Sequence, residues 1–238
     1  MKEIRIQKFI SDSGVMSRRA AEKEIESGRV TVNFDKAVIG QKIDPEKDIV
    51  RISGKLVKKD KNDKKYVMLY KPRGYVTTMS DEKGRKCIPE LISDIGQRLY
   101  PCGRLDMESE GLLILTNDGE VAEKLMHPKT HIEKIYHVKV RTEISPENLK
   151  KLNSPMTIDG YDIKPVKVTI ISRKENETQL RFTLCEGRNR QIRKMCENCG
   201  LEVLRLKRVS VGNLNIGMLK PGKWRYLNHS ETEYLKKL

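Results

Sequence analysis

Residues 101–119 read Pro-Cys-Gly-Arg-Leu-Asp-Met-Glu-Ser-Glu-Gly-Leu-Leu-Ile-Leu-Thr-Asn-Asp-Gly. Gly103 allows a tight backbone turn, and Asp106 follows in a loop, preceded by Arg104. Gly111 lets the chain bend into the buried strand that comes next, and the closing Asn-Asp-Gly is a turn signature. An arbitrary loop aspartate usually bonds neighbouring backbone amides, whereas a carboxylate beside a rigid strand is well placed for chemistry. The stretch predicts a loop-borne acidic group next to a core strand.

From residue 66 to residue 238, short apolar runs typical of strands outnumber the helical stretches and do not alternate regularly with them. This order favours an α+β domain with a mainly antiparallel mixed sheet, not a doubly wound one. The strand-like runs are 66–70, 75–78, 112–115, 136–140, 166–171, 179–184 and 203–206, and the predicted helices are 120–126, 146–152 and 190–199.

The predicted helix over residues 190–199 has an apolar and a basic face. Its apolar side chains fall at i, i+3, i+4 and i+7, which favours packing roles for the two cysteines over a zinc site, for which no further ligands are in place. Asn189 is a suitable N-cap and would put the positive end of the helix near incoming phosphate. The apolar face consists of Ile192, Met195, Cys196 and Cys199, and the basic face of Arg190, Arg193 and Lys194.

Residues 1–58 predict a separate module of two helices and short strands. Ser17 is placed to cap a helix over residues 18–27, and Gly28 to stop it. Arg18, Arg19 and Lys23 lie off the apolar stripe of this helix, as a phosphate-facing surface requires. The remaining signals are helical spacing of Ile6, Phe9 and Ile10, strand alternation at Val30 and Val32, a turn at Asp35-Lys36 and a strand over 48–53.

Charge and cysteine content narrow the class of partner and the compartment. The formal net charge of +15 indicates that the binding partner is a polyanion such as nucleic acid. Residues 59–65 hold no apolar side chain and predict an exposed charged linker. The five cysteines form no disulfide framework, and neither a signal run nor a membrane-spanning stretch is visible, so we expect a cytoplasmic protein without a membrane partner.

The stretch at 101–119 resembles the signature of the RsuA/RluB/RluF family of ribosomal RNA pseudouridine synthases. Gly103-Arg104-Leu105-Asp106, Gly111-Leu112-Leu113 and Thr116-Asn117-Asp118-Gly119 carry the likeness. Residues 3–55 resemble the small RNA-binding module first known from a small-subunit ribosomal protein. Further motifs follow in the family's order: Lys71-Pro72-Arg73-Gly74, Leu125-Met126-His127-Pro128, Glu133-Lys134-Ile135-Tyr136, residues 186–195, Leu206-Lys207-Arg208-Val209 and Gly217-Met218-Leu219.

The resemblance implies specific roles in a site without metal or other cofactor. Asp106 matches the essential aspartate, Tyr136 the tyrosine that stacks on the uracil, and Arg193 the arginine that pairs with the aspartate. Leu206 matches the apolar residue against the base, and Arg104 a position that holds the RNA where the base is extruded. A guanidinium would keep a buried carboxylate ionised. Other expected RNA contacts are Arg18, Arg19, Lys23, Arg188 and Arg190.

The implied reaction moves uracil from an N1 to a C5 link on the same ribose carbon. The carboxylate could act as a nucleophile or remove a ribose proton, and the sequence leaves both routes open. A non-catalytic RNA-binding or ribosome-assembly factor on the same scaffold fits the charge and the N-terminal module equally well.

The expected partner is ribosomal RNA or a pre-ribosomal particle, and the expected protein is a monomer. Residues 187–191 and 222–225 resemble the family's large-subunit enzymes more closely, and this resemblance favours large-subunit over small-subunit RNA as the target.

Overall fold

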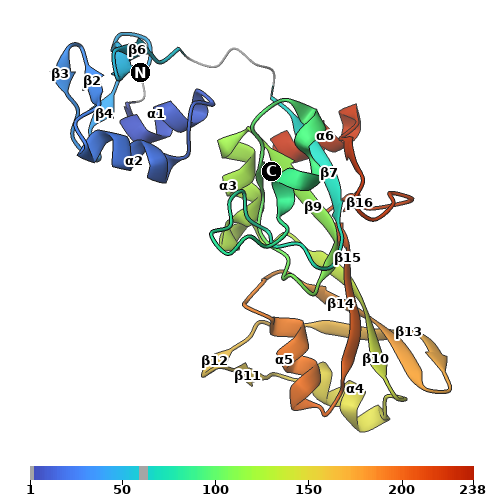
Figure 1. Cartoon of the computed structure of the whole chain (residues 1–238). Coiled ribbons are helices and arrows are strands. Elements are labelled where there is room, and N and C mark those ends of the chain that lie inside the picture. The colour runs from blue at the N-terminus through green and yellow to red at the C-terminus, as the bar shows by residue number, and fades with distance from the viewer. Residues whose placement is uncertain (1–2, 59–63) are drawn as a thin grey trace. The chain divides into compact units, whose positions relative to one another are not determined.

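The structure is a computed structural model that describes residues 3–58 and 64–238. Contacts within the chain divide it into two compact units, shown in Figure 1. One unit comprises residues 1–65 together with 117–119, and the other comprises 66–116 and 120–238. Residues 59–63 of the predicted linker lie outside the described residues. No helix in the described part has the length and apolar character needed to cross a bilayer.

The first unit packs two helices, α1 (Ile6–Asp12) and α2 (Arg18–Glu26), against short strands. The predicted cap is confirmed, because the Ser17 hydroxyl accepts a hydrogen bond from the Ala20 amide at 3.1 Å. The core includes Ile6, Ile10 and Ile25. The strands are β1 (Ile4–Arg5) paired with β4 (Lys42–Ile43), and β2 (Val30–Val32), β3 (Asp35–Lys36), β5 (Val50–Ile52) and β6 (Lys55–Leu56) in the order β3-β2-β5-β6.

The turn expected at Asp35-Lys36 is wrong, because these two residues form β3 and the reversal occurs at Asn33-Phe34. Both turn residues have positive φ, 50° and 79°. The Asn33 side chain fixes this conformation by donating to the Asp48 carboxylate at 2.7 Å and accepting from the Ile49 amide at 2.9 Å. The sequence pattern did not reveal this turn because Phe34 occupies the second turn position, where glycine is usual.

The second unit is built on a nine-stranded mixed sheet, which confirms the α+β fold (Figure 1). Its main path runs β13-β14-β10-β15-β9-β7-β17. All neighbours on this path are antiparallel except β15 and β9, which are parallel. These strands are β7 (Tyr66–Lys71), β9 (Glu110–Thr116), β10 (Lys134–Arg141), β13 (Lys167–Lys174), β14 (Glu177–Leu184), β15 (Val203–Val211) and β17 (Trp224–Tyr226).

Helices and short elements complete this unit. The helices are α3 (Gly119–Met126), α4 (Pro146–Leu152), α5 (Gln191–Asn198) and α6 (His229–Lys237), with 3-10 turns at Ile88–Leu91, Ser93–Ile95 and Pro128–Thr130. The short strands are β8 (Tyr100–Pro101), β16 (Leu214–Asn215) and the hairpin β11 (Thr157–Ile158) and β12 (Tyr161–Asp162). One core cluster joins α4 and α5 to β10, β13 and β14, and another joins α3 and α6 to β7, β9 and β15.

The parallel contact between β9 and β15 joins the two halves of the sheet through only two register pairs, Glu110 with Lys207 and Gly111 with Arg208. Gly111 lies inside β9 with φ +112°, rather than in a bend before it. A Cβ at this position would lie 2.2 Å from the Arg208 carbonyl oxygen and 2.7 Å from its amide nitrogen. Glycine is therefore required for the two backbones to meet.

Helix α5 confirms one prediction and corrects another. Met195, Cys196 and Cys199 are buried in the core, so the cysteines are packing residues. The expected N-cap at Asn189 is wrong: the cap position is Arg190, with φ +52°, and no side chain caps it. The Gln191 side chain instead accepts a hydrogen bond from the Arg188 amide at 3.2 Å, which holds the entering loop.

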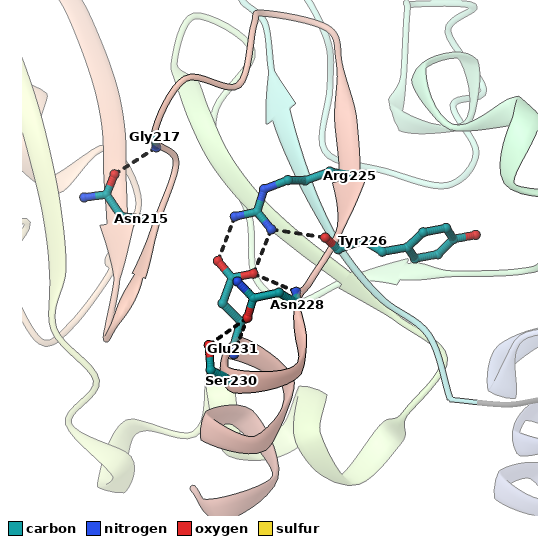
Figure 2. A network of polar contacts seen from close by, with 7 residues as sticks. All are labelled: Asn215, Gly217, Arg225, Tyr226, Asn228, Ser230 and Glu231. Atoms are coloured by element: carbon teal, nitrogen blue, oxygen red, sulfur yellow. Dashed lines mark hydrogen bonds and ion pairs between the residues drawn. The ribbon is translucent and has the colours of Figure 1, made fainter.

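The C-terminal residues form a polar network that fixes α6 to β17, shown in Figure 2. The Arg225 guanidinium donates to both carboxylate oxygens of Glu231 at 2.7 Å. Asn228 and Glu231 form a reciprocal cap at the helix start, each bond 2.9 Å long. Trp224 donates through Nε1 to Asp94 at 2.9 Å. Trp224 and Arg225, which the sequence associated with large-subunit RNA, thus have structural partners.

Candidate active site

The loop that carries Asp106 is held by hydrogen bonds to its backbone on both sides of this residue. The Thr77 hydroxyl donates to the Leu105 carbonyl at 2.6 Å and accepts from the Leu105 amide at 3.1 Å. The Gly74 amide donates to the Met107 carbonyl at 2.8 Å. Segment 75–78 was expected to be strand-like; it is not part of the sheet, and Thr77 binds the Asp106 loop from it. Asp106 itself is half-buried.

One pocket gathers every candidate residue that the sequence placed in the second unit. Tyr136 comes from β10 and Leu206 from the adjacent β15, and their side chains are 7% and 5% exposed. Arg193 comes from α5. The candidates that line the pocket are Asp106, Tyr136, Arg193, Leu206, Arg104, Arg188 and Arg190. The other lining residues are Leu105, Ser109, Leu184, Gly187, Gln191 and Ile192. A carboxylate, an aromatic ring, an apolar wall and several guanidinium groups thus share one cleft.

A second, larger cavity shares Arg104, Tyr136 and Gly187 with this pocket. Lys134 and Arg208 add two cationic side chains to its wall. The other lining residues are mostly apolar or small: Thr77, Pro101, Cys102, Gly103, Ile114, Leu125, Met126 and Val211. The cleft therefore continues from the carboxylate into a space with cationic groups on an otherwise apolar wall.

Arg193 has a different partner from the one expected. Its Nη2 donates to the Glu108 carbonyl at 3.1 Å, and its Nε lies 3.9 Å from the Glu108 carboxylate. Within the described residues, no hydrogen bond or ion pair joins Arg193 to Asp106, and the buried Nε has no hydrogen-bond partner. Burial lowers the pKa of Arg193, and the charges of Glu108 and, more weakly, Asp106 oppose this shift. The Arg193 guanidinium thus lines the pocket with its buried Nε donor unused.

Glu108 is itself shared between two arginines. Its carboxylate accepts from the Arg190 guanidinium at 3.2 Å, which lowers the pKa of Glu108. The carboxylate two positions beyond Asp106 therefore organises the basic side of the pocket.

Two buried cations hold the backbone around the Asp106 loop, Lys71 in the segment that binds the loop and Arg208 at the loop itself. Their motifs were visible in the sequence, but these contacts were not. Lys71 is fully buried and donates to the carbonyls of Pro72 and Tyr75 at 2.9 and 2.8 Å. Burial lowers the pKa of Lys71 to about 8, against the opposing charges of Asp106 and Glu110.

Arg208, 4% exposed, is the second cation. It donates through Nε to the Leu112 carbonyl at 2.8 Å and through Nη1 to the Arg104 carbonyl at 3.5 Å. It therefore connects β15 to Arg104, just before Asp106, and to Leu112 of β9.

The three N-terminal candidates belong to the other unit. Arg18, Arg19 and Lys23 are exposed on α2, while Ala21 and Ile25 of the same helix are buried. No cluster of three or more histidine, cysteine or acidic side chains positioned for a metal ion occurs in residues 3–58 and 64–238.

Each of the two units matches a known protein family. The RNA pseudouridylate synthase family profile matches residues 65–198, and the S4 domain profile matches residues 4–50. The chain is 42% identical to an uncharacterized RNA pseudouridine synthase of Aquifex aeolicus, over 100% of this chain and 95% of that protein. It is 41% identical to the ribosomal large subunit pseudouridine synthase B of Bacillus subtilis, over 98% and 96%.

A solved structure described as a pseudouridylate synthase agrees with these relatives. It superposes with a TM-score of 0.70 at 28% identity, over 98% of this chain and 99% of that one. The choice between an enzyme and a non-catalytic binding factor is thereby decided for the enzyme. The chain belongs to the RsuA/RluB/RluF family of RNA pseudouridine synthases and carries an N-terminal S4 domain.

Proposed function

We propose that this enzyme converts a specific uridine of ribosomal RNA to pseudouridine, with Asp106 as the essential residue and without a metal or organic cofactor. The observation that carries the proposal is the single pocket shared by Asp106, Tyr136, Arg193 and Leu206. The reaction breaks the bond from uracil N1 to ribose C1′ and forms one from C5 to the same carbon. The proton on C5 is lost and N1 gains one, so no electrons are exchanged with a cofactor.

The pocket supplies what this isomerisation requires. The uracil must leave the RNA stack and turn within the site, so it needs a flat apolar enclosure. The buried Tyr136 ring and the Leu206 side chain offer one from adjacent strands. Asp106 either attacks as a nucleophile or removes a ribose proton. Arg193, whose Nε is unused among the described residues, supplies a donor for the carboxylate or the substrate.

We assign RNA positioning to the cationic residues around this pocket and on the S4 domain. Arg104, Arg188 and Arg190 line the cleft, and Arg18, Arg19 and Lys23 are exposed on α2. Phosphate contacts from such groups offset the cost of extruding the base. In this assignment residues 1–58 form the RNA-binding module, 59–65 the linker and 66–238 the catalytic domain of a cytoplasmic monomer.

We further propose that the target lies in large-subunit ribosomal RNA. The Bacillus subtilis relative, 41% identical, is named for that subunit. Four residues of segment 187–191 line the pocket, where RNA would be read: Gly187, Arg188, Arg190 and Gln191. Residues 222–225 are weaker evidence for the target RNA, because Arg225 and Trp224 already form hydrogen bonds within the protein, to Glu231 and Asp94.

Tritium release tests the proposal directly. The purified protein is incubated with large-subunit or small-subunit ribosomal RNA transcripts that carry 5-tritiated uridine. We expect release of one tritium per large-subunit transcript, because forming the C5 bond expels the C5 hydrogen. The modified position is then mapped in cells with and without the gene. Release from small-subunit RNA alone would reject the subunit assignment, and no release from either RNA or from assembly intermediates would reject the activity.

Thr77 offers a prediction on the positioning of Asp106. Thr77→Val removes both hydrogen bonds to Leu105 while keeping the side-chain shape. Since displacement of a catalytic group by about 1 Å can cost about 100-fold, kcat should fall about 10- to 100-fold with little change in KM. Thr77→Ser keeps the hydroxyl and should stay within about threefold of wild type. Equal kcat values for the valine and serine variants would show that Thr77 does not position Asp106.

A further inference from the structure

The hairpin β11–β12 lies beside α5 (Figure 1) and carries an exposed tyrosine. Its turn is Asp159-Gly160, with φ +51° and +74°, a sequence that favours such two-residue turns. Tyr161 follows directly and remains 45% exposed. An ion pair between Asp159 and Lys194 and the buried side chain of Ile158 tie the hairpin to the helix and the core. The position of the exposed Tyr161 ring is therefore fixed by the contacts of its hairpin.

Arg188 lies over this ring, with its guanidinium carbon 3.0 Å from the ring centroid. The guanidinium is also held from the side, since its Nε lies 3.8 Å from the Glu186 carboxylate. That carboxylate in turn accepts from the Lys164 amide at 3.0 Å and from the Gln191 side chain at 2.9 Å. Arg188 is thus placed before any ligand arrives.

The pair stands at the rim of the catalytic pocket. Arg188 lines the same pocket as Asp106, whereas Tyr161 is outside its lining. On the proposed function the reacting base lies against Tyr136 and Leu206, and Tyr161 does not line the pocket that holds it. The Arg188–Tyr161 pair is placed instead to contact the RNA chain on one side of the target nucleotide.

We propose that Arg188 and Tyr161 form a stacking platform for an unpaired nucleobase that flanks the target uridine. This inference rests on the proposed function. Single-stranded bases stack on aromatic rings and on guanidinium planes, and such contacts tolerate any base because every base has a π face. The cation that covers the ring also pairs with the phosphate backbone beside that base. The platform selects RNA that is unpaired next to its target.

The test compares Tyr161→Leu with the matched control Tyr161→Phe, in the full-length enzyme. RNA hairpins carry the target uridine with 2-aminopurine, whose fluorescence is quenched by stacking, as an unpaired neighbour. We expect Tyr161→Leu to weaken RNA binding and raise KM about tenfold, to reduce the quenching, and to leave kcat within about twofold. Tyr161→Phe keeps the ring and should match wild type in all of these measurements.

The salt dependence of binding separates stacking from charge. Tyr161→Leu should leave the slope of log Kd against log salt unchanged, whereas Arg188→Leu should reduce it by about one unit or slightly less. Unchanged affinity and quenching in Tyr161→Leu would overturn the platform, as would equal losses in Tyr161→Phe. Wild-type protein that binds and quenches but releases no tritium would reject the proposed function and leave the platform standing.

Discussion

Asp106→Asn is expected to abolish tritium release, by at least about 1,000-fold, while RNA affinity and thermal stability stay near the wild-type values. Amide and carboxylate have nearly the same shape, and the loop is held through Leu105 and Met107 rather than through the Asp106 side chain. The substitution therefore removes the negative charge and the basicity without moving the pocket. A loss of this size is on the scale of an essential acid–base or nucleophilic group.

Asp118→Asn is the matched control for this experiment. It makes the same chemical change twelve positions further along the same signature, and Asp118 does not line the pocket. It should retain activity within about threefold. Tritium release by Asp106→Asn at even a tenth of the wild-type rate would remove Asp106 from the mechanism, and a parallel loss of RNA binding would make it a binding residue.

Gly111→Ala is expected to have the largest effect on stability, a loss of more than about 4 kcal/mol or failure to accumulate as folded protein. The new methyl group would lie 2.2 Å from the Arg208 carbonyl oxygen, a backbone atom that cannot move without separating β9 from β15. The φ of +112° is also unfavourable for any L side chain. Urea unfolding of the purified variant measures the loss.

Gly103→Ala separates the two causes of this instability. Gly103 also has a positive φ, +87°, but a Cβ there would meet nothing within 4 Å. It should therefore cost only about 1–2 kcal/mol, the conformational term alone. If Gly111→Ala lost no more than Gly103→Ala, the close approach of the two backbones would not be a determinant of the fold.

Apolar patterning was sufficient to predict the main strands of the catalytic domain, because β7 and β9 are continuous buried runs and β10 and β14 alternate buried with more exposed residues. It did not predict β17 or α6. Residues 112–115 and 179–184 lie within β9 and β14, and the helix at 146–152 has the predicted bounds. Segment 75–78 misled the prediction because its groups bind a loop instead of a neighbouring strand. The parallel pairing of β9 with β15 had no local signature either, since it depends on a contact between distant residues.

The members of the site could be identified from their motifs, but their contacts could not. Asp106, Tyr136 and Leu206 share a pocket, as expected from the resemblance. The partner of Arg193 is Glu108, and this depends on how α5 meets the loop in three dimensions. Thr77 had no signal at all, because a single hydroxyl acquires its importance only from the two backbone groups it reaches.

The contact between β9 and β15 also brings together two parts of the pocket that are synthesised at different times. Asp106 stands just before β9, whereas Leu206 belongs to a strand that ends at residue 211 of 238. A chain still being translated has its aspartate long before it has the opposite wall of the pocket. We therefore expect a chain that ends before β15 to lack the Leu206 wall of the pocket and to have no pseudouridine synthase activity.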